Sequence, residues 1–314
     1  MSQPHVIVLS GGISHEREVS LRSGRRVADA LESAGIRVTL ADTDAELLHT
    51  LISQRPDVVF PAVHGASGED GALLSLLEAL KLPYVGSPAA AALIAWSKPI
   101  ARHLVEQSGI AVPSGVVLSR EAFRELSAAA VLDVLTSTQS FPLVVKPGQG
   151  GSAQGVTIVS EADALPRAMV DAFTYADTAV CEQKIDGVEV AVSVVETNDG
   201  VQALPAVEIE PLNGVYGYEA RYNAGETRFF APARLSDEVS RRVAETGVQV
   251  HQVLGLRDLS RVDLIVDRDG TPWFLEANAI PGMTETSLLP LALDAAKLNH
   301  GEFYANLVRR ALNR

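Results

Sequence analysis

The segment LSRVDLIVDRDGTPWFLEANAIPGMTETSLLP, residues 259–290, carries the strongest structural signal in this chain. Residues 262–267 and 272–277 are short apolar runs of the kind that form β-strands. Asp269 and Gly270, which stand between these runs, are typical of a tight hairpin turn. The pattern therefore predicts an antiparallel β-hairpin.

Three side chains with oxygen donors, Asp263, Glu276 and Asn278, belong to this hairpin. The register brings Asp263 and Glu276 side by side, and the alternation of a strand puts Arg261 on the same face as Asp263. Carboxylate and amide oxygens are the ligands that Mg²⁺ prefers in proteins, often together with substrate phosphates. The alternative is a hairpin whose charges face water. We favour a metal site because these carboxylates lie within apolar runs, where an unpaired charge is costly to bury.

Composition narrows the class of protein. The chain has 314 residues, 47% of them hydrophobic, and a formal net charge of −13. This length suits two or three subdomains, each with its own core. The acidic balance argues against a nucleic-acid partner, because proteins that bind nucleic acids usually carry a basic patch. No apolar run approaches the roughly 18 residues of a membrane-spanning helix, so no membrane association is expected.

The N-terminal residues and the single cysteine indicate the cellular compartment of the protein. The chain enters an apolar strand at residues 5–9 without the basic segment and cleavage site of a signal peptide. Cys181 has no partner for an intramolecular disulfide, which fits a reducing cytoplasm. We therefore expect a cytoplasmic protein in which Cys181 is a core residue.

Residues 5–97 alternate between strand and helix patterns. Such alternation predicts a parallel sheet with helices on both faces, as in Rossmann-like α/β domains. The loops 10–16 and 64–70 each follow a predicted strand. Ligands bind at that end of the strands in open α/β sheets, so both loops are candidates for a binding site.

The remainder of the chain has a mixed α+β pattern. Residues 198–200, Asn-Asp-Gly, separate two strand patterns and predict a second antiparallel hairpin. Residues 127–140 are the least patterned stretch and suggest a surface loop, whereas 290–297 and 301–313 read as amphipathic helices. We expect three domains, at 1–97, 98–188 and 189–314.

A glycine-rich loop, GQGGSAQG at 148–155, follows Lys146 between two predicted strands. Backbone N–H groups freed by glycine can wrap a phosphate, and a lysine at the end of an apolar strand adds a positive charge. A flexible hairpin tip is the alternative, and the position of Lys146 favours the phosphate site. Lys98 alone would be taken as a surface lysine.

Two further segments have the composition of ligand-binding elements. The strand pattern 179–190 places Glu182 and Glu189 between apolar residues, where an edge could present backbone groups to an adenine ring. An ordinary edge strand with outward charges remains the alternative. The segment YGYEARYNAGETRFF, 216–230, suggests a mobile lid over a substrate, or otherwise an aromatic surface loop.

Taken in order, these segments resemble the D-alanine–D-alanine ligases of the ATP-grasp superfamily. The resemblance rests on HEREVSLRSG, HGASGEDG, KP-GQGGSAQG, E-QKI-DGVEV, YGYEARY, RVDL and LEAN-IPGMTETS, which cover the chain from residue 5 to about residue 312. Each block alone is weak, whereas the ordered set is highly specific. The resemblance implies an ATP-grasp fold, in which an N-terminal Rossmann-like domain precedes two α+β lobes that clamp ATP.

The resemblance also implies how ATP and the metal are held. The residues that correspond to the family's nucleotide-binding positions are Lys98 and Lys146 for the phosphates, Arg221 for a residue that faces ATP, Glu182 and Ile185 for adenine, and Glu189 for the ribose. Asp263, Glu276 and Asn278 correspond to the ligands of Mg²⁺, with Mn²⁺ as an alternative ion. Arg261 corresponds to the arginine that steadies the charge of the developing acyl phosphate.

The amino-acid substrates have their own set of matching residues. Glu16 corresponds to the acid that holds the ammonium group of the first D-alanine, and Ser152 and Tyr222 to its hydrogen-bonded partners. The residues that match the pocket for the second amino acid's carboxylate are Gly282, Ser287 and Leu288. His64 lies in the loop near the first substrate.

Departures from the family pattern bear on the second substrate. Arg221 replaces a lysine that faces ATP, which keeps the charge but changes its geometry. Ala279 and Ile280 stand where the family has a hydroxyl-bearing residue beside the metal site. The resemblance implies a homodimeric enzyme that joins two D-alanines for peptidoglycan synthesis. The alternatives are an ATP-grasp ligase for another amino-acid pair, in antibiotic biosynthesis or resistance, and a non-catalytic ATP-binding regulator.

Overall fold

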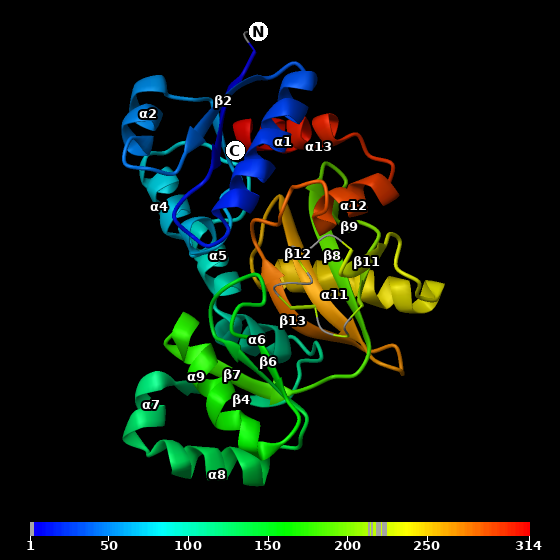
Figure 1. The fold of residues 1–314 in the computed structure, drawn as a ribbon. Helices are drawn as coiled ribbons and strands as arrows, with labels where there is room; N and C mark the ends of the chain where they lie inside the picture. The colour runs from blue at the N-terminus through cyan, green and yellow to red at the C-terminus, as the bar shows by residue number, and fades with distance from the viewer. Residues whose placement is uncertain (1–2, 213, 215, 218–220, 222–224) are drawn as a thin grey trace.

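The computed structural model describes residues 3–212, 214, 216, 217, 221 and 225–314. These residues form three β-sheets, each packed against helices (Figure 1). None of the helices in this described part combines the length and apolar character that a membrane-spanning segment requires. The arrangement confirms the expected combination of an α/β unit with α+β units.

The first sheet is parallel, with strand order β2-β1-β3, and forms the N-terminal unit. Its elements are β1 His5–Ser10, α1 Arg17–Ser33, β2 Arg37–Asp42, α2 Leu47–Gln54, β3 Val58–Pro61, α3 Ala66–Glu69, α4 Ala72–Ala79 and α5 Ala89–Trp96. Strand β1 is buried along its whole length. Its alternate residues belong to two different apolar clusters. Val6 and Val8 cluster with residues of α1, whereas Ile7 and Leu9 cluster with residues of α2 and α4. Helices therefore cover both faces, as the alternating pattern predicts.

The second sheet is antiparallel, with strand order β4-β7-β5-β6. Its unit comprises α6 Lys98–Gln107, β4 Gly115–Ser119, α7 Arg120–Glu125, α8 Ala128–Thr138, β5 Leu143–Pro147, β6 Thr157–Val159, the 3₁₀ helix η1 Ala162–Ala164, α9 Leu165–Tyr175 and β7 Thr178–Gln183. Helix α9 packs on β5 and β7 and buries Met169 and Phe173. Cys181 is fully buried in this core, as expected.

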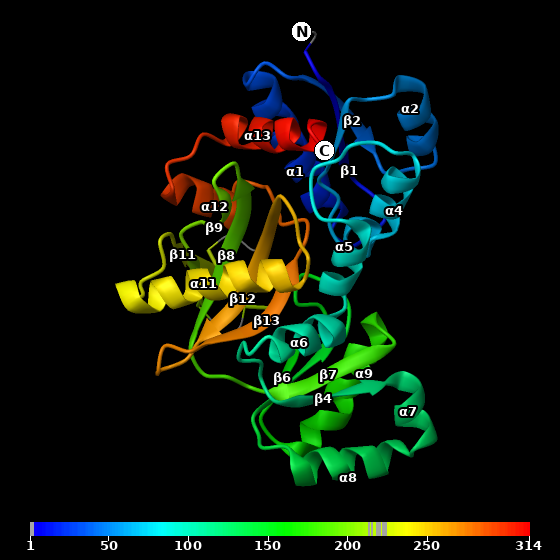
Figure 2. The same ribbon diagram turned by 180° about the vertical axis from the view of Figure 1, so that it is seen from behind.

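The third sheet has the strand order β11-β10-β8-β12-β13, and β9 pairs with β8. Its unit comprises β8 Val188–Thr197, β9 Gly200–Ala203, β10 Val207–Pro211, β11 Thr227–Phe230, α11 Asp237–Val253, β12 Leu259–Val266, β13 Pro272–Asn278, α12 Leu288–Ala295 and α13 His300–Leu312. Figure 2 shows α11 lying across one face of this sheet, and α12 packs against β8 and β10. The interior strand β12, between β8 and β13, is consequently almost entirely buried.

The C-terminal helix α13 packs against α1 and β3 of the N-terminal unit, which are distant from it in the sequence (Figure 1). Tyr304 of α13 meets Phe60 of β3 edge to face, with ring centroids 5.7 Å apart. The first and last parts of the chain thus share one apolar core. The division into domains at 1–97, 98–188 and 189–314 stays a prediction.

Two local expectations need correction, and one helix was not expected. Residues 127–140, expected as a surface loop, form helix α8. The second strand of the hairpin predicted around residues 198–200 is divided into β9 and β10. The 17-residue helix α11 was not anticipated by the sequence patterns considered above.

Candidate active site

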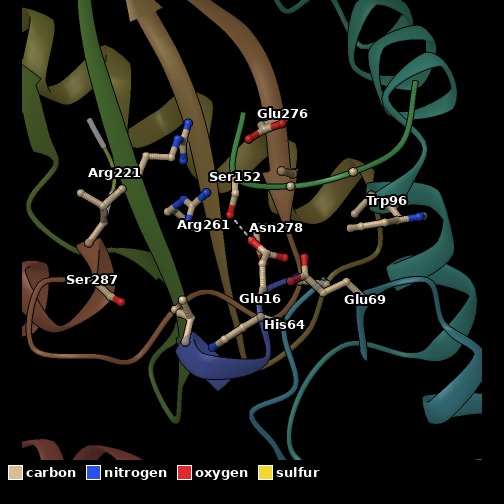
Figure 3. A pocket seen from close by; sticks show the side chains of 18 of the residues that line it. Glu16, His64, Glu69, Trp96, Ser152, Arg221, Arg261, Glu276, Asn278 and Ser287 are labelled. Carbon is tan, nitrogen blue, oxygen red and sulfur yellow. Dashed lines mark hydrogen bonds between the residues drawn. The ribbon is translucent and has the colours of Figure 1, made fainter. Parts of the chain in front are cut away.

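Two adjoining cavities occupy the region where the three units meet. The first is lined by Glu16, His64, Glu69, Lys98, Ser152, Arg261, Glu276, Asn278, Gly282, Ser287 and Leu288, among others (Figure 3). The second is lined by Lys98, Lys146, Glu182, Ile185, Glu189, Asp263 and Glu276, among others. Lys98, Tyr216, Arg221 and Glu276 line both, so the two cavities share a charged wall. Apart from Tyr222, which lies outside the described residues, every predicted site residue lines one of them.

The β12–β13 hairpin has the expected register. Asp263 stands opposite Glu276, and Arg261 stands opposite Asn278. The Arg261 guanidinium binds both carboxylate oxygens of Asp263, at 2.7 and 2.8 Å. The pairing shifts between Asp263 and Leu264, as in a β-bulge, which is a feature that re-aims side chains next to binding sites.

Lys98, at the start of α6, joins the hairpin to the glycine-rich loop. Its ammonium group lies 3.0 Å from the Glu276 carboxylate and donates a hydrogen bond of 2.7 Å to the Gly150 carbonyl. Burial alone would raise the pKa of Glu276, but the charges of Lys98, Arg221 and Arg261 outweigh it and lower this pKa to about 2. Glu276 is therefore a carboxylate at neutral pH.

The glycine-rich loop lies over Glu16. The Ser152 hydroxyl donates a hydrogen bond to the Glu16 carboxylate, as Figure 3 shows. A Cβ at Gly151 would lie 3.1 Å from that carboxylate, so a side chain there would crowd Glu16. Ser152 and Ala153 have left-handed backbone torsions, φ 53° and 55°. The loop thus adopts a sparsely populated conformation that brings it against the N-terminal unit.

Glu69 is a residue of the first cavity to which the sequence analysis assigned no role. It is buried and accepts a hydrogen bond of 2.9 Å from the Gly65 backbone N–H. Burial raises its pKa well above the ordinary value, and the neighbouring Glu16 adds to the effect. Its position in HGASGEDG, after a strand of the parallel sheet, was the only signal that could have singled it out.

The segment from Ile280 to Leu288 closes the far side of the first cavity. The Ile280 N–H donates to the Asn278 side-chain oxygen at 2.8 Å. Thr284 donates its N–H to the Ser287 hydroxyl at 3.0 Å. Gly282 packs so closely on Ser287 that a Cβ would come within 2.7 Å of its hydroxyl. A side chain at position 282 would therefore have to displace the Ser287 hydroxyl.

The second cavity has a volume of about 450 Å³, within the range of roughly 300–1,000 Å³ that is usual for small-molecule sites. On its wall, Lys146 lies 2.5 Å from Glu182, which also pairs with Arg102. Burial raises the pKa of Glu189 to about 7, although the charge of Arg221 opposes the shift. An anionic ligand near Glu189 therefore meets a carboxyl group that is only partly ionised at neutral pH.

The backbone N–H groups at the end of β7 and just after it donate hydrogen bonds within the protein. Gln183 donates its N–H to the Ser114 carbonyl and Lys184 to the Pro142 carbonyl. Ile185 follows these residues and lines the second cavity. Gln183 and Lys184 line the same cavity.

The predicted metal ligands are close in the hairpin but face different cavities. Asp263 lines the second cavity, Asn278 the first, and Glu276 both. In the described part of the chain, no three His, Cys, Asp or Glu side chains form a group that could hold a metal ion. The donor types suit Mg²⁺, which binds oxygen ligands and leaves part of its shell to substrate phosphates.

Comparison with known proteins establishes the family. A family model described as "D-ala D-ala ligase C-terminus" matches residues 104–312, and one described as "D-ala D-ala ligase N-terminus" matches residues 48–87. The chain belongs to the D-alanine–D-alanine ligase family. A D-alanine–D-alanine ligase of Anaeromyxobacter sp. strain K is 42% identical over 285 residues, which are 91% of this chain and 89% of that protein.

Solved structures of this family have the same fold. The VanG D-Ala:D-Ser ligase from Enterococcus faecalis superposes with a TM-score of 0.85 at 27% identity and covers 99% of this chain and 100% of that one. A D-alanine–D-alanine ligase from Bacillus anthracis, complexed with ATP, has a TM-score of 0.82 at 27% identity and covers 99% of this chain and 98% of that one. The ATP-grasp fold expected from the sequence is thereby confirmed.

Proposed function

We propose that this protein joins two D-alanine molecules to D-alanyl-D-alanine at the cost of ATP, for the synthesis of peptidoglycan precursors. The observation that carries the proposal is the charged wall between the two cavities, at which Lys98, Arg221 and Glu276 line both. A reaction that passes a phosphoryl group from a nucleotide to an amino acid needs such a shared boundary. Membership of the family and the 42% identity to a D-alanine–D-alanine ligase point to the same activity.

The second cavity is the proposed nucleotide site. Lys98, Lys146 and Arg221 supply positive charge for the phosphates, while Glu182 and Ile185 face adenine and Glu189 the ribose. Asp263, Glu276 and Asn278 are the proposed ligands of Mg²⁺, which when bound neutralises phosphate charge during phosphoryl transfer. The ATP complex of the Bacillus anthracis relative supports nucleotide binding by this fold.

The first cavity is the proposed amino-acid site. Glu16 accepts the ammonium group of the first D-alanine, whose carboxylate then takes the γ-phosphoryl group of ATP. Arg261, at the boundary between the cavities, stabilises the charge that develops on this acyl phosphate. The amine of the second D-alanine attacks the acyl carbon, and phosphate leaves. The carboxylate of this second substrate is held by Gly282, Ser287 and Leu288. His64 forms part of the wall of the first cavity.

Closure over the acyl phosphate is needed because water would hydrolyse it. The hydrogen bond between Ser152 and Glu16 supports a closed position of the glycine-rich loop. We propose that Tyr222 completes this contact from the 216–230 segment. The enzyme is further proposed to be a cytoplasmic homodimer, in keeping with the family and the lone buried Cys181.

The direct test of the substrate is ADP and phosphate release by the purified protein with ATP, Mg²⁺ and a panel of D- and L-amino acids. The proposal requires D-alanine alone to support turnover and to yield the dipeptide. Turnover that needs a second, different amino acid would instead favour the rival ligase. Ala279 and Ile280, beside the acceptor pocket, would then be the residues to exchange first.

A further inference from the structure

Two side chains of α1, which line neither cavity, bind the backbone of the segment 280–283. The Met283 N–H donates to the Ser23 hydroxyl oxygen at 3.1 Å, and Arg26 donates its Nε–H to the Met283 carbonyl at 3.2 Å. Both backbone polar groups of Met283 are therefore bound by one helix of the N-terminal unit. Ser23 has no solvent exposure, so it cannot touch a substrate.

His64 binds the other end of the same segment and contacts Ser23 as well. Its Nδ1 lies 3.1 Å from the Ile280 carbonyl, and its Nε2 lies 2.8 Å from the Ser23 hydroxyl. A carbonyl only accepts hydrogen bonds, so Nδ1 carries the proton. Nε2 of the neutral ring is then an acceptor, and the Ser23 O–H donates to it. Burial keeps the imidazole neutral, because it lowers the pKa of His64 to about 4.

This assignment satisfies every polar group in the cluster. The Ser23 hydroxyl donates once, to His64, and accepts once, from Met283. Both nitrogens of His64 are bound within the protein, so the ring has no proton to exchange with a substrate. Gly282, between the two fixed residues, lines the first cavity and packs on Ser287.

We propose that Ser23 is a positioning residue: through His64 and Met283 it fixes the backbone of residues 280–283 and thereby sets the affinity for the acceptor amino acid. The inference rests on the proposed function, in which Gly282 and Ser287 hold the carboxylate of the second D-alanine. A displacement of about 1 Å at such a site can cost up to about 100-fold in rate. Loss of the Ser23 hydroxyl removes both contacts at once.

The chain supplies a matched control for this test. Ser20 lies one turn earlier on α1, is equally buried, and donates its hydroxyl to the Ala62 carbonyl at 2.7 Å. Ser20→Ala therefore removes a buried hydroxyl from the same helix without touching 280–283. Steady-state kinetics of Ser23→Ala should show a KM for the second D-alanine raised at least about 10-fold. The KM for ATP should stay within about twofold, and Ser20→Ala should leave both constants unchanged.

A second variant tests whether Ser23 acts through the His64 imidazole. His64→Asn keeps an N–H near the position of Nδ1 but removes the acceptor for Ser23. If Ser23 acts through His64, the double variant should be little worse than the more impaired single variant, because both changes break one network. Additive increases in the KM for the acceptor would contradict the proposal that Ser23 acts through His64. The His64→Asn variant provides this test even if Ser23→Ala folds poorly.

Hydrogen exchange of the peptide that spans 280–283 tests the positioning without any substrate. Ser23→Ala should speed exchange there, whereas Ser20→Ala should not. Unchanged exchange, or a loss of thermal stability with no change in the KM for the acceptor, would overturn the proposal. This measurement needs no turnover. Its result therefore remains interpretable even if the protein does not ligate D-alanine, and failure of the positioning proposal can be told apart from failure of the proposed function.

Discussion

Asp263 and Glu276 face each other across the β12–β13 hairpin, and each is neutralised by a cation from a different place in the chain. Asp263 is bound by Arg261 on its own strand, whereas Glu276 is bound by Lys98 at the start of α6. The pairs hold two positive charges at the boundary of the two cavities. That boundary is where the proposed mechanism needs charge for the phosphates and the acyl phosphate.

The first prediction concerns Glu276, which lines both cavities. Glu276→Gln keeps the shape and an acceptor for Lys98 but removes the negative charge. We expect kcat to fall at least about 100-fold, because loss of one charged oxygen ligand at a phosphoryl-transfer site costs several kcal/mol. ADP release in saturating Mg²⁺ measures this, with the exposed Glu161→Gln as control. Near-normal activity would contradict the assignment of Glu276.

Lys146 is expected to act on the nucleotide and not on the amino acids. Lys146→Ala should raise the KM for ATP by about 10-fold or more and lower kcat, because a charged contact to phosphate is lost. The KM for the second D-alanine should change by less than about twofold. Lys184→Ala is the matched control, since Lys184 lines the same cavity but pairs with Asp186 at its rim. Equal effects of the two substitutions would show that Lys146 contributes only general charge.

Nucleotide choice provides a test of the edge at Ile185. Adenine offers a donor and an acceptor to a backbone edge, and guanine offers the reversed pattern at the corresponding atoms. We therefore expect kcat/KM for ATP to exceed that for GTP by about 100-fold or more, since unpaired polar groups at a buried site are costly. Comparable use of the two nucleotides would place the base elsewhere in the second cavity.

Acid stability should depend on Glu196, which lies outside both cavities. His251, whose Nε2 lies 3.6 Å from the carboxylate, the Asp258 backbone and a 2.7 Å hydrogen bond from Arg310 lower the pKa of Glu196 from its ordinary 4.5 to about 2. A depressed pKa stabilises the folded state above pH 4.5, and this contribution is lost as the pH falls toward 2. Glu196→Gln should therefore reduce the free energy of unfolding by about 1–2 kcal/mol at pH 7, after allowance for solvent screening.

Urea unfolding at pH 7, 5, 4 and 3 would follow the difference between wild type and Glu196→Gln. The difference should shrink steadily below pH 4.5. A difference that is the same at pH 7 and pH 3 would mean that packing, and not the charge of Glu196, is what the substitution removes.

Local patterns were sufficient for the hairpin at the centre of the site. Period-two alternation and the Asp269-Gly270 turn fix the register, and the register alone places Asp263 opposite Glu276. The same reasoning anticipated the parallel N-terminal sheet. In contrast, α8 was not predicted, because its apolar residues lack a clear periodicity. The high helix propensity of its three alanines favours the helix that forms.

Long-range relationships could not be predicted in this way. The contact of Ser23 with Met283 joins residues 260 positions apart, and neither segment carries a sign of the other. The docking of α13 on the N-terminal sheet is of the same kind, because an amphipathic pattern shows that a face is buried but not which partner buries it. The ion pair between Lys98 and Glu276 likewise required the fold, and from its sequence context alone Lys98 would be a surface residue.

The central claim is tested most directly by the fate of one oxygen atom. Purified protein would be incubated with ATP, Mg²⁺ and D-alanine that carries ¹⁸O in its carboxylate, and the products analysed by mass spectrometry. Ligation through an acyl phosphate predicts that D-alanyl-D-alanine forms and that the released phosphate contains one ¹⁸O atom per dipeptide. Absence of the dipeptide, or dipeptide formed together with unlabelled phosphate, would contradict the account.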